Sequence, residues 1–532
     1  MPIKRMRIWP RVNPAALLMA AGLALVAIVA LAPRAHAQAS PADSLRISLD
    51  DAIARALAAG EEMQAAESNW KLAHALYVQA RSTALPQLNL STSYTRQIES
   101  IFGGAVPDID MFEPDTLAPL EDRVRALEDA FPTAGLSGLG ALFSNTSFAS
   151  ENTWVAALSL NQTIFRGGAV WNSIAAAKSA LQAAEELRAD QEREVVLAVR
   201  EAYLGALLAD WNVRIAKLAL DQADSQLRRV RLRAEAGEAS EFELLQAEVG
   251  RDNQGPVIKR AEASRDLGYL ELARLANLPP DAPIALTDPI LNGPAGDRAQ
   301  GRALPGGPSS GGEGTRSSAA RDSLASLPDL DALLARSQYS PGIVALENIV
   351  RAREHAVPIA AAGRWPALSL FASYSEQAYP GDFLPTRGDW LEDARAGVEL
   401  SWSLFDGLRT GGAIQQAKAE AEQARQQLQQ ARERIRQAVV QSRLDLERAA
   451  ADLAARSRTV ELARRSYELA SLRFDEGASD LLEVSDARIA FQLAQTFEAQ
   501  ARHDAFVALA RLERYSGQPW FASSLARAGA GK

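Results

Sequence analysis

The chain repeats itself at a constant spacing. Residues 152–279 recur 240 positions later, so that Phe165 corresponds to Phe405. A shorter stretch upstream recurs at an offset of 280, where Tyr94 corresponds to Tyr374. Self-similarity at a fixed spacing indicates a duplicated structural unit, and this unit is far too long for a solenoid repeat. Each copy is therefore expected to form one half of a single fold.

Each half contains two segments of about ten residues in which apolar and polar side chains alternate, a pattern typical of strands. The four strands are expected at about 87–97, 152–165, 367–377 and 394–405. Their apolar faces carry Tyr94, Trp154, Tyr374 and Trp402. Aromatic side chains in such positions favour membrane strands over a soluble sheet with one wet face. Four strands are too few to close a barrel, so a barrel requires several copies of the chain.

Two stretches without proline follow the second strand of each half, at about 169–236 and 411–476. As continuous helices of about 65 residues they would each be about 100 Å long. Gly167, Gly168 and Gly407 precede them, and glycine permits the sharp backbone change from strand to helix.

Apolar residues recur at alternating spacings of three and four along both long helices. The pattern runs from Ala206 to Ala234 and, in the same register, from Leu446 to Phe474, with Arg456 as the one exception. Such a seam predicts coiled-coil packing.

Shorter helices and connecting segments complete the organisation. Helices are expected at about 49–80, 240–277, 329–361 and 480–516. The first half then covers 38–292 and the second half 329–519, with a tail at 520–532. Residues 293–328 between the halves are rich in Gly, Ser and Pro, which indicates a flexible linker.

The N-terminus is typical of a secretory signal at residues 1–37. A basic region precedes the apolar run from Ala15 to Ala32, and Ala35-His36-Ala37 is a small-residue cleavage site. Removing its five basic residues changes the net charge from −9 to −14. A nucleic-acid binder would carry a positive net charge instead. No other apolar run is long enough for a transmembrane helix, so a secreted chain could span an outer membrane only as a closed barrel.

No constellation for catalysis or for a cofactor is expected. The chain has no cysteine, and the histidines beyond the signal, His74, His355 and His503, lie far apart. Neither a metal site nor a glycine-rich phosphate loop is indicated. Energy for any transport must then come from a partner protein.

The doubled strand pair and helical hairpin resemble the TolC-like outer-membrane efflux proteins (outer-membrane factors). The matching segments are the Pro-Gln-Leu-Asn-Leu opening of the first strand at Pro86, Leu160-Asn-Gln-Thr-Ile-Phe-Arg-Gly-Gly with Ser403-Leu-Phe-Asp-Gly, and Gly477-Ala-Ser-Asp-Leu-Leu-Glu-Val-Ser-Asp-Ala-Arg. The resemblance implies an α+β membrane protein: a trimeric 12-stranded β-barrel, four strands per chain, that continues into a long α-helical coiled-coil periplasmic tunnel. It implies residence in the cell outer membrane with a large periplasmic portion.

The resemblance also implies function and partners. The chain would be a homotrimeric channel of a tripartite efflux or type I secretion system, passively conducting substrates to the exterior. It would bind a periplasmic adaptor (membrane fusion protein), an inner-membrane transporter of the RND, ABC or MFS type, and outer-membrane lipid, and no nucleic acid or cofactor. The alternative is a periplasmic coiled-coil adaptor or scaffold without a barrel.

Matched from Gly477, the acidic constriction of the family falls on Glu483 and Asp486. They are three residues apart at a helix start and so share a face. The alternative is that these are ordinary acids of a helix start, where negative charge interacts favourably with the helix dipole. The family's contacts between tip hairpins fall on Glu243, Phe474, Ser479 and Arg502. Phe474 lacks the hydroxyl of the aromatic residue at the equivalent family position, and Ser479 lacks the positive charge of the basic residue at its position. The usual contacts between the tip hairpins are therefore not expected.

Overall fold

The structure is a computed structural model that describes residues 45–98, 117–129, 151–280, 282–287, 329–380 and 382–517. The expected signal at 1–37, the linker at 293–328 and the tail at 520–532 lie outside these residues, as does most of the long first loop.

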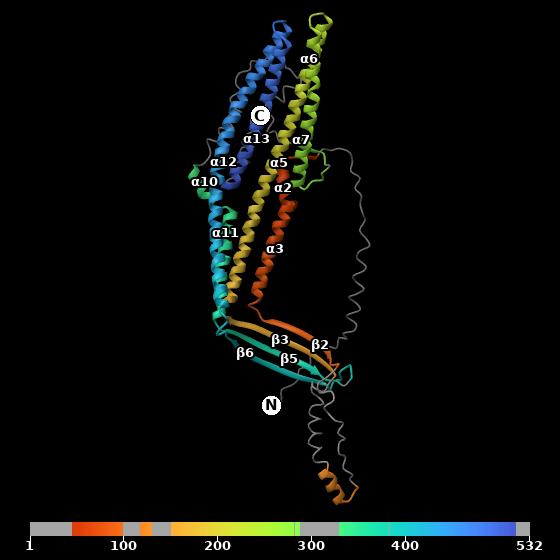
Figure 1. Cartoon of the computed structure of the whole chain (residues 1–532), viewed down its shortest axis with the longest axis vertical. Helices are drawn as coiled ribbons and strands as arrows, with labels where there is room; N and C mark the ends of the chain where they lie inside the picture. The colour runs from red at the N-terminus through yellow and green to blue at the C-terminus, as the bar shows by residue number, and fades with distance from the viewer. Residues whose placement is uncertain are drawn as a thin grey trace, which may run out of the picture.

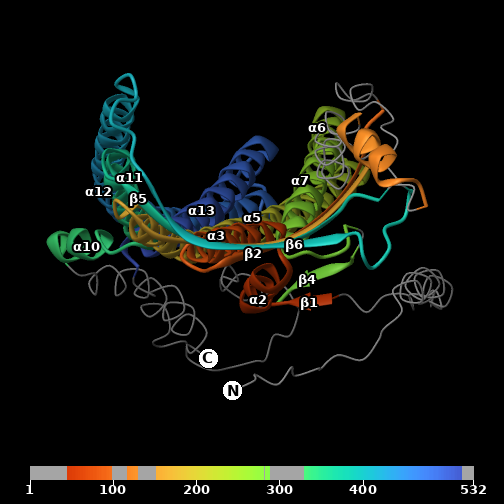
Figure 2. The same cartoon turned by 90° about the horizontal axis from the view of Figure 1, so that it is seen from below.

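A four-stranded antiparallel sheet lies at one end of a long bundle of helices (Figure 1). Its strands are β2 (Gln87–Arg96), β3 (Asn152–Arg166), β5 (Ala367–Ala378) and β6 (Trp390–Ser401). They form one curved layer in the order β2-β3-β5-β6 (Figure 2). The two halves of the sequence therefore meet between β3 and β5, and β2 and β6 are the free edges of this sheet.

Strand pairing brings the apolar residues of neighbouring strands opposite one another. Tyr94 pairs with Trp154, and Leu158 pairs with Tyr374. The Tyr94 and Trp154 rings lie 4.8 Å apart at the end of the sheet away from the helices, and Phe383 joins them. The alternation in the sequence thus gathers most apolar side chains of the four strands on one face, with aromatic side chains near its outer end. The paired Glu376 and Glu392 interrupt this face.

The last strand differs from the sequence expectation of 394–405, because β6 begins and ends four residues earlier. Ser401 pairs with Ala367, the first residue after Pro366. Since proline has no N–H to continue the ladder, pairing stops there. Trp402 consequently lies outside the strand, and its indole Nε1 donates to the Arg364 carbonyl at 3.2 Å.

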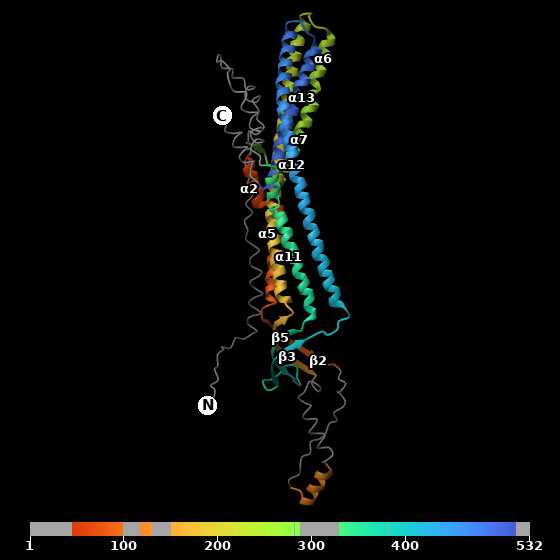
Figure 3. The same ribbon diagram turned by 90° about the vertical axis from the view of Figure 1, so that its left-hand side faces the viewer.

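The two long helices are α5 (Ala169–Glu235) and α12 (Arg409–Asp475), each of 67 residues. Their bounds differ by 240 at both ends, so the offset in the sequence is also an offset in structure. At 1.5 Å per residue, each helix is about 100 Å long. Both run from the sheet to the far tip of the molecule (Figures 1 and 3).

The apolar seam of these helices is buried or half-buried along its length. The exceptional Arg456 is accommodated at the surface of the seam, where it pairs with Asp452 at 3.2 Å. Its guanidinium carbon also lies 4.9 Å from the centre of the Phe497 ring. A cation over an aromatic face lets the polar residue occupy an otherwise apolar row.

Three expected helices are each divided in two. The segment expected at 49–80 forms α2 (Leu49–Ala59) and α3 (Glu61–Ser82); 240–277 forms α6 (Glu241–Asp252) and α7 (Gln254–Leu275); 329–361 forms α10 (Leu330–Ser337) and α11 (Pro341–Ala361). Gly60 separates the first pair, where a Cβ would lie 2.3 Å from the Ala56 carbonyl oxygen. Pro341 starts α11, because the residue before a proline avoids helical geometry.

A short parallel strand pair, which the sequence did not indicate, lies beside the middle of the bundle. It joins β1 (Leu45–Ile47) to β4 (Ile284–Leu286). The buried Tyr203 of α5 donates its hydroxyl to the Ile47 carbonyl at 3.2 Å. Three residues per strand are too few for periodicity to reveal them.

The end of α13 (Leu481–Ser516) is attached to α5 by ion pairs in the same region. Arg514 lies 3.0 Å from Asp190, and Arg200 lies 2.9 Å from Glu513. These side chains are largely removed from solvent, so their charges are weakly screened. None of the described helices has a stretch long and apolar enough to cross a membrane.

Both strand-to-helix junctions require two successive residues with positive φ. Gly167 and Gly168 have φ of 54° and 78°, and Gly407 and Leu408 have φ of 65° and 70°. The second junction therefore uses a leucine where the first uses a glycine. At Gly167 a Cβ would lie 2.8 Å from the Ala362 carbonyl oxygen, whereas at Gly407 it would meet no atom within 4 Å.

We expect Gly407→Ala to cost about 1 kcal/mol, since an L-residue tolerates left-handed geometry at roughly that penalty. Gly167→Ala should cost several times more, because its Cβ also collides with backbone that cannot rotate away. The apparent melting temperature of the purified protein, followed by circular dichroism, measures both. Equal losses for the two variants would contradict the role assigned to the close approach at Gly167.

Candidate functional site

The two helical turns farthest from the sheet form the tip of the molecule (Figure 3). One joins α5 to α6, and the other joins α12 to α13. Each contains a left-handed glycine, Gly237 with φ of 80° and Gly477 with φ of 72°. In each, the N–H of the following residue donates to the carbonyl of Arg233 or Arg473 at 2.7 Å. The turns are thus two copies of one helix-ending motif.

The helix that follows the first turn begins with a capping box. Ser240 accepts from the Glu243 N–H at 3.3 Å, and the Glu243 carboxylate accepts from the Ser240 N–H at 2.7 Å. This exchange satisfies two N–H groups that the first helical turn cannot bond internally. Glu243, expected to take part in contacts between tip hairpins, here binds within its own turn.

The second turn uses the equivalent residues differently. Asp480 accepts from the Glu483 N–H at 2.8 Å, but the Glu483 carboxylate does not return to the cap. It accepts instead from Arg473 Nη1 at 2.7 Å. Arg473 also donates to the Ala478 carbonyl at 3.3 Å, so it ties the end of α12 to the start of α13.

Asp486 lies one turn beyond Glu483 on the same helix and is exposed. Within the described part of the chain it forms no ion pair or hydrogen bond. The two acids expected at the constriction are therefore brought onto one face, but in different electrostatic settings. Glu483 is neutralised in part by Arg473, whereas Asp486 keeps an uncompensated charge.

Phe474 fastens the two hairpins to each other, although it lacks a hydroxyl. Its side chain is only 2% exposed. Arg233 of α5 lies with its guanidinium carbon 4.7 Å from the ring centre and donates to the Phe474 carbonyl at 3.2 Å. The ring packs in an apolar cluster, here called the tip core. Its buried members are Val230, Ala247, Ala470, Phe474, Leu481 and Val484.

The other two residues expected at the tip lie in different surroundings. The Ser479 hydroxyl donates to the Asp480 carbonyl at 3.4 Å and, within the described ranges, bonds to no other hairpin. Arg502 donates to Glu498 at 2.8 Å, one turn earlier on α13. It is about 24 Å along the helix from Asp486, so it does not belong to the tip.

Arg233 and Arg473 are the tip residues that sequence reasoning did not assign. Each stands four positions before its turn glycine, and they are 240 residues apart. The repeat therefore contained a signal for them. Their different partners, Phe474 and Glu483, depend on three-dimensional packing that the repeat does not specify.

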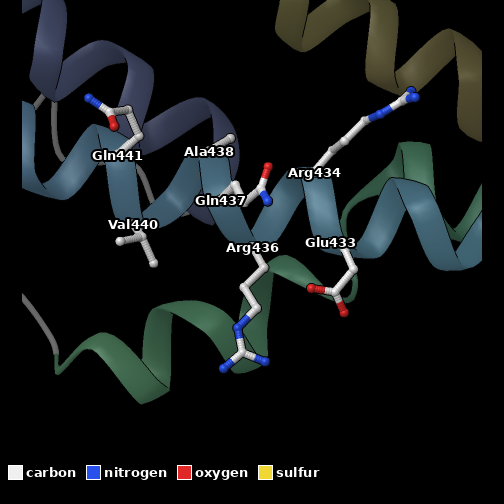
Figure 4. A pocket seen from close by; sticks show the side chains of 7 residues that line it. All are labelled: Glu433, Arg434, Arg436, Gln437, Ala438, Val440 and Gln441. Atoms are coloured by element: carbon white, nitrogen blue, oxygen red, sulfur yellow. The ribbon is translucent and has the colours of Figure 1, made fainter.

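The part of the chain that the structure describes holds no cluster of three or more side chains suited to a metal ion. A wide, open hollow of about 750 Å³ lies on the middle of α12 (Figure 4). It is lined by Glu433, Arg434, Arg436, Gln437, Ala438, Val440 and Gln441. These residues belong to one helix, and Arg434 and Arg436 extend to opposite sides of it. Such a surface does not converge on a ligand, so we assign it no chemistry.

We expect Phe474→Ala to loosen the tip by about 3 kcal/mol, because a buried ring is lost from a packed cluster. Amide hydrogen exchange in the first turns of α6 and α13 should accelerate about a hundredfold. Leu472→Ala, at an exposed position on the same helix, is the matched control and should leave exchange unchanged. Equal acceleration in both variants would contradict the attachment through Phe474.

Comparison with known proteins places this geometry in a family. The outer membrane efflux protein family matches residues 52–277 and 334–518, which is most of the chain and both halves of the repeat. No curated protein sequence matches it.

Several solved structures share the fold. The outer membrane protein VceC of Vibrio cholerae is 18% identical with a TM-score of 0.63, and the match covers 88% of this chain and 96% of that one. The CmeC outer membrane channel of Campylobacter jejuni is 16% identical with a TM-score of 0.63, covering 91% and 89%. The open state of the MtrE outer membrane channel of Neisseria gonorrhoeae is 18% identical with a TM-score of 0.62, covering 88% of each chain.

These likenesses establish a TolC-like channel fold of long helices and strands. The resemblance stated from the sequence motifs is confirmed, and the alternative of an adaptor without a channel is set aside by the family match. The chain belongs to the outer membrane efflux protein family, and it is an outer-membrane efflux channel rather than an enzyme.

Proposed function

We propose that three copies of the chain assemble into one duct, with β6 of each copy pairing with β2 of the next in a 12-stranded barrel. The supporting observation is the open four-stranded sheet, in which β2 and β6 have a partner on one side only. Unpaired strand edges are unfavourable in a membrane, and closure into a barrel removes them. Exposed apolar side chains on these edge strands suit contact with lipid. They include Leu88, Leu90, Val398 and Leu400.

The helices support the same assembly. Exposed apolar residues recur at helical spacing on α6 and on α13. They are Phe242, Leu245 and Val249, and Leu482, Ile489 and Leu493. Such stripes at a tip of otherwise charged helices are suited to packing between copies, which would extend the barrel into a periplasmic tunnel.

The duct would act passively within a tripartite efflux or type I secretion system. A periplasmic adaptor would bind the helical portion, and an inner-membrane transporter of the RND, ABC or MFS type would select the cargo and supply energy. Deleting the gene should sensitise cells to exported compounds or abolish secretion of a substrate protein, and complementation should restore it. Isolation of the full-length protein as a soluble periplasmic monomer would contradict this function.

Disulfide trapping tests the strand pairing. Because the chain has no native cysteine, only the introduced cysteines can form a disulfide. We expect a cysteine at Ser91 of β2, combined with cysteines scanned over 393–399 of β6, to give oxidised dimers and trimers. Neighbouring strands lie about 4.8 Å apart, within reach of a disulfide. The control pairs the Ser91 position with Ser373 of β5, an interior strand flanked on both sides. Cross-linking in the control, or ladders beyond a trimer, would contradict the arrangement.

We propose further that Glu483 and Asp486 of three copies form two stacked carboxylate rings that constrict the periplasmic end. Carboxylates around a narrow pore attract cations. The Arg473 pairing makes the two rings unequal, since it compensates only Glu483. Asp486 is then the stronger cation ligand, and Arg473 moderates the other ring.

In planar bilayers, Asp486→Asn should raise the divalent-cation concentration needed for half block by about tenfold. That factor corresponds to the loss of roughly one close charge interaction at a surface. Glu483→Gln should have a smaller effect. Arg473→Gln should strengthen block a few-fold, because a surface ion pair of at most about 1 kcal/mol is released. Unchanged block in the Asp486→Asn, Glu483→Gln double variant would remove the ring assignment.

A further inference from the structure

A buried arginine without a counter-charge lies behind the tip. Arg488 stands two residues beyond Asp486 on α13, and it is only 6% exposed. Its Nη1 is buried and donates to no acceptor in the described part of the chain. Burial lowers the pKa of Arg488 from its ordinary value, because desolvation disfavours the cation. An arginine nevertheless stays charged in proteins, so this site holds an uncompensated positive charge.

A second unused donor comes from the other half of the chain. Gln226 of α5 is 7% exposed, and its Oε1 accepts a hydrogen bond from Arg229. Since a guanidinium only donates, this contact fixes which end of the amide is the oxygen. Gln226 Nε2 is therefore a donor, and it is buried with no acceptor among the residues that the structure describes.

Both residues line one small cavity of about 30 Å³ between α5, α6 and α13. Gln246 and Ser485 add further polar groups to its lining, and no carboxylate belongs to it. The rest of the lining is small or apolar, namely Ala223, Ala247, Gly250, Leu481 and Val484. Three of these, Ala247, Leu481 and Val484, are also members of the tip core. The site is thus electropositive, offers several hydrogen-bond donors and has a size for one small ion.

We propose that this cavity binds one small monovalent anion of halide size, chloride being the abundant example. A buried charge is costly unless it is paired and hydrogen-bonded, and an anion here would accept from both Arg488 and Gln226. Water also fits the volume, but it would leave the charge uncompensated. The proposal does not depend on the trimer or on the gate.

Anion binding would join the two halves at the tip. Gln226 and Gln246 belong to the first half, whereas Arg488 and Ser485 belong to the second. An ion held by both sides stabilises the packed arrangement by mass action, in proportion to the logarithm of its concentration once the site is filled. Chloride would thereby stabilise the attachment of α13 to α5 and α6, directly behind Glu483 and Asp486.

The purified full-length protein provides the test. Its melting temperature should rise as chloride replaces gluconate at constant ionic strength, and bromide should substitute for chloride. Crystals grown in bromide should show anomalous scattering in the cavity between Arg488 and Gln226. Arg488→Gln should abolish the chloride dependence, and Gln226→Leu should weaken halide affinity by about tenfold through loss of one charged hydrogen bond.

Arg465→Gln is the matched control, because it removes an exposed arginine that pairs within its own helix with Glu461. It should retain the chloride dependence of the native protein. Should Arg488→Gln fail to fold, the Gln226→Leu variant and the bromide crystals decide. A cavity occupied only by water in bromide crystals would overturn the proposal, as would identical melting in chloride and gluconate.

Discussion

The whole architecture depends on a continuous backbone that leads from the sheet into each long helix, across two residues between β3 and α5 and across seven between β6 and α12. At each junction two successive residues adopt positive φ, and a helix of 67 residues then begins. The first junction can do this only because Gly167 lets the chain pass against Ala362, which belongs to the second half. Both junctions therefore direct a long helix away from the sheet, and the first also brings the two halves into contact.

Because the long helices extend far from the sheet, the other helices must cover their apolar seams. A helix about 100 Å long cannot bury its own apolar seam. The helices α3, α7 and α11 lie along α5, while α11 and α13 lie along α12. The shorter helices are divided at Gly60 and Pro341, so that each long helix is covered by several segments in turn.

Much of this fold could be predicted because the internal repeat indicates each main element in both halves of the chain. The offset of 240 places both long helices, and period-two alternation places four strands. Besides the helix breaks at Gly60 and Pro341, what the sequence did not predict depends on pairing partners rather than on local pattern. The end of β6 is set by Pro366 on the neighbouring strand, and the β1–β4 pair joins segments more than 200 residues apart. No local periodicity contains such information.

The tip shows why the candidate site was only partly predictable. Positions 240 apart share backbone geometry, yet their side chains have separate partners. Glu243 completes a capping box, whereas the equivalent Glu483 binds Arg473. Gln246 lines the tip cavity, while the equivalent Asp486 is exposed.

The same divergence places a charge in the interior. Glu248 pairs with Arg231 at the surface, 3.2 Å away, while its equivalent Arg488 is buried beside Gln226. Duplication supplies a symmetric scaffold on which two side chains at equivalent positions can perform different functions. One half can keep the residue that satisfies the helix, and the other half can place an acid on the surface or a cation in a cavity. The chemistry that we propose for this channel thus lies where the two halves share a backbone but not a sequence.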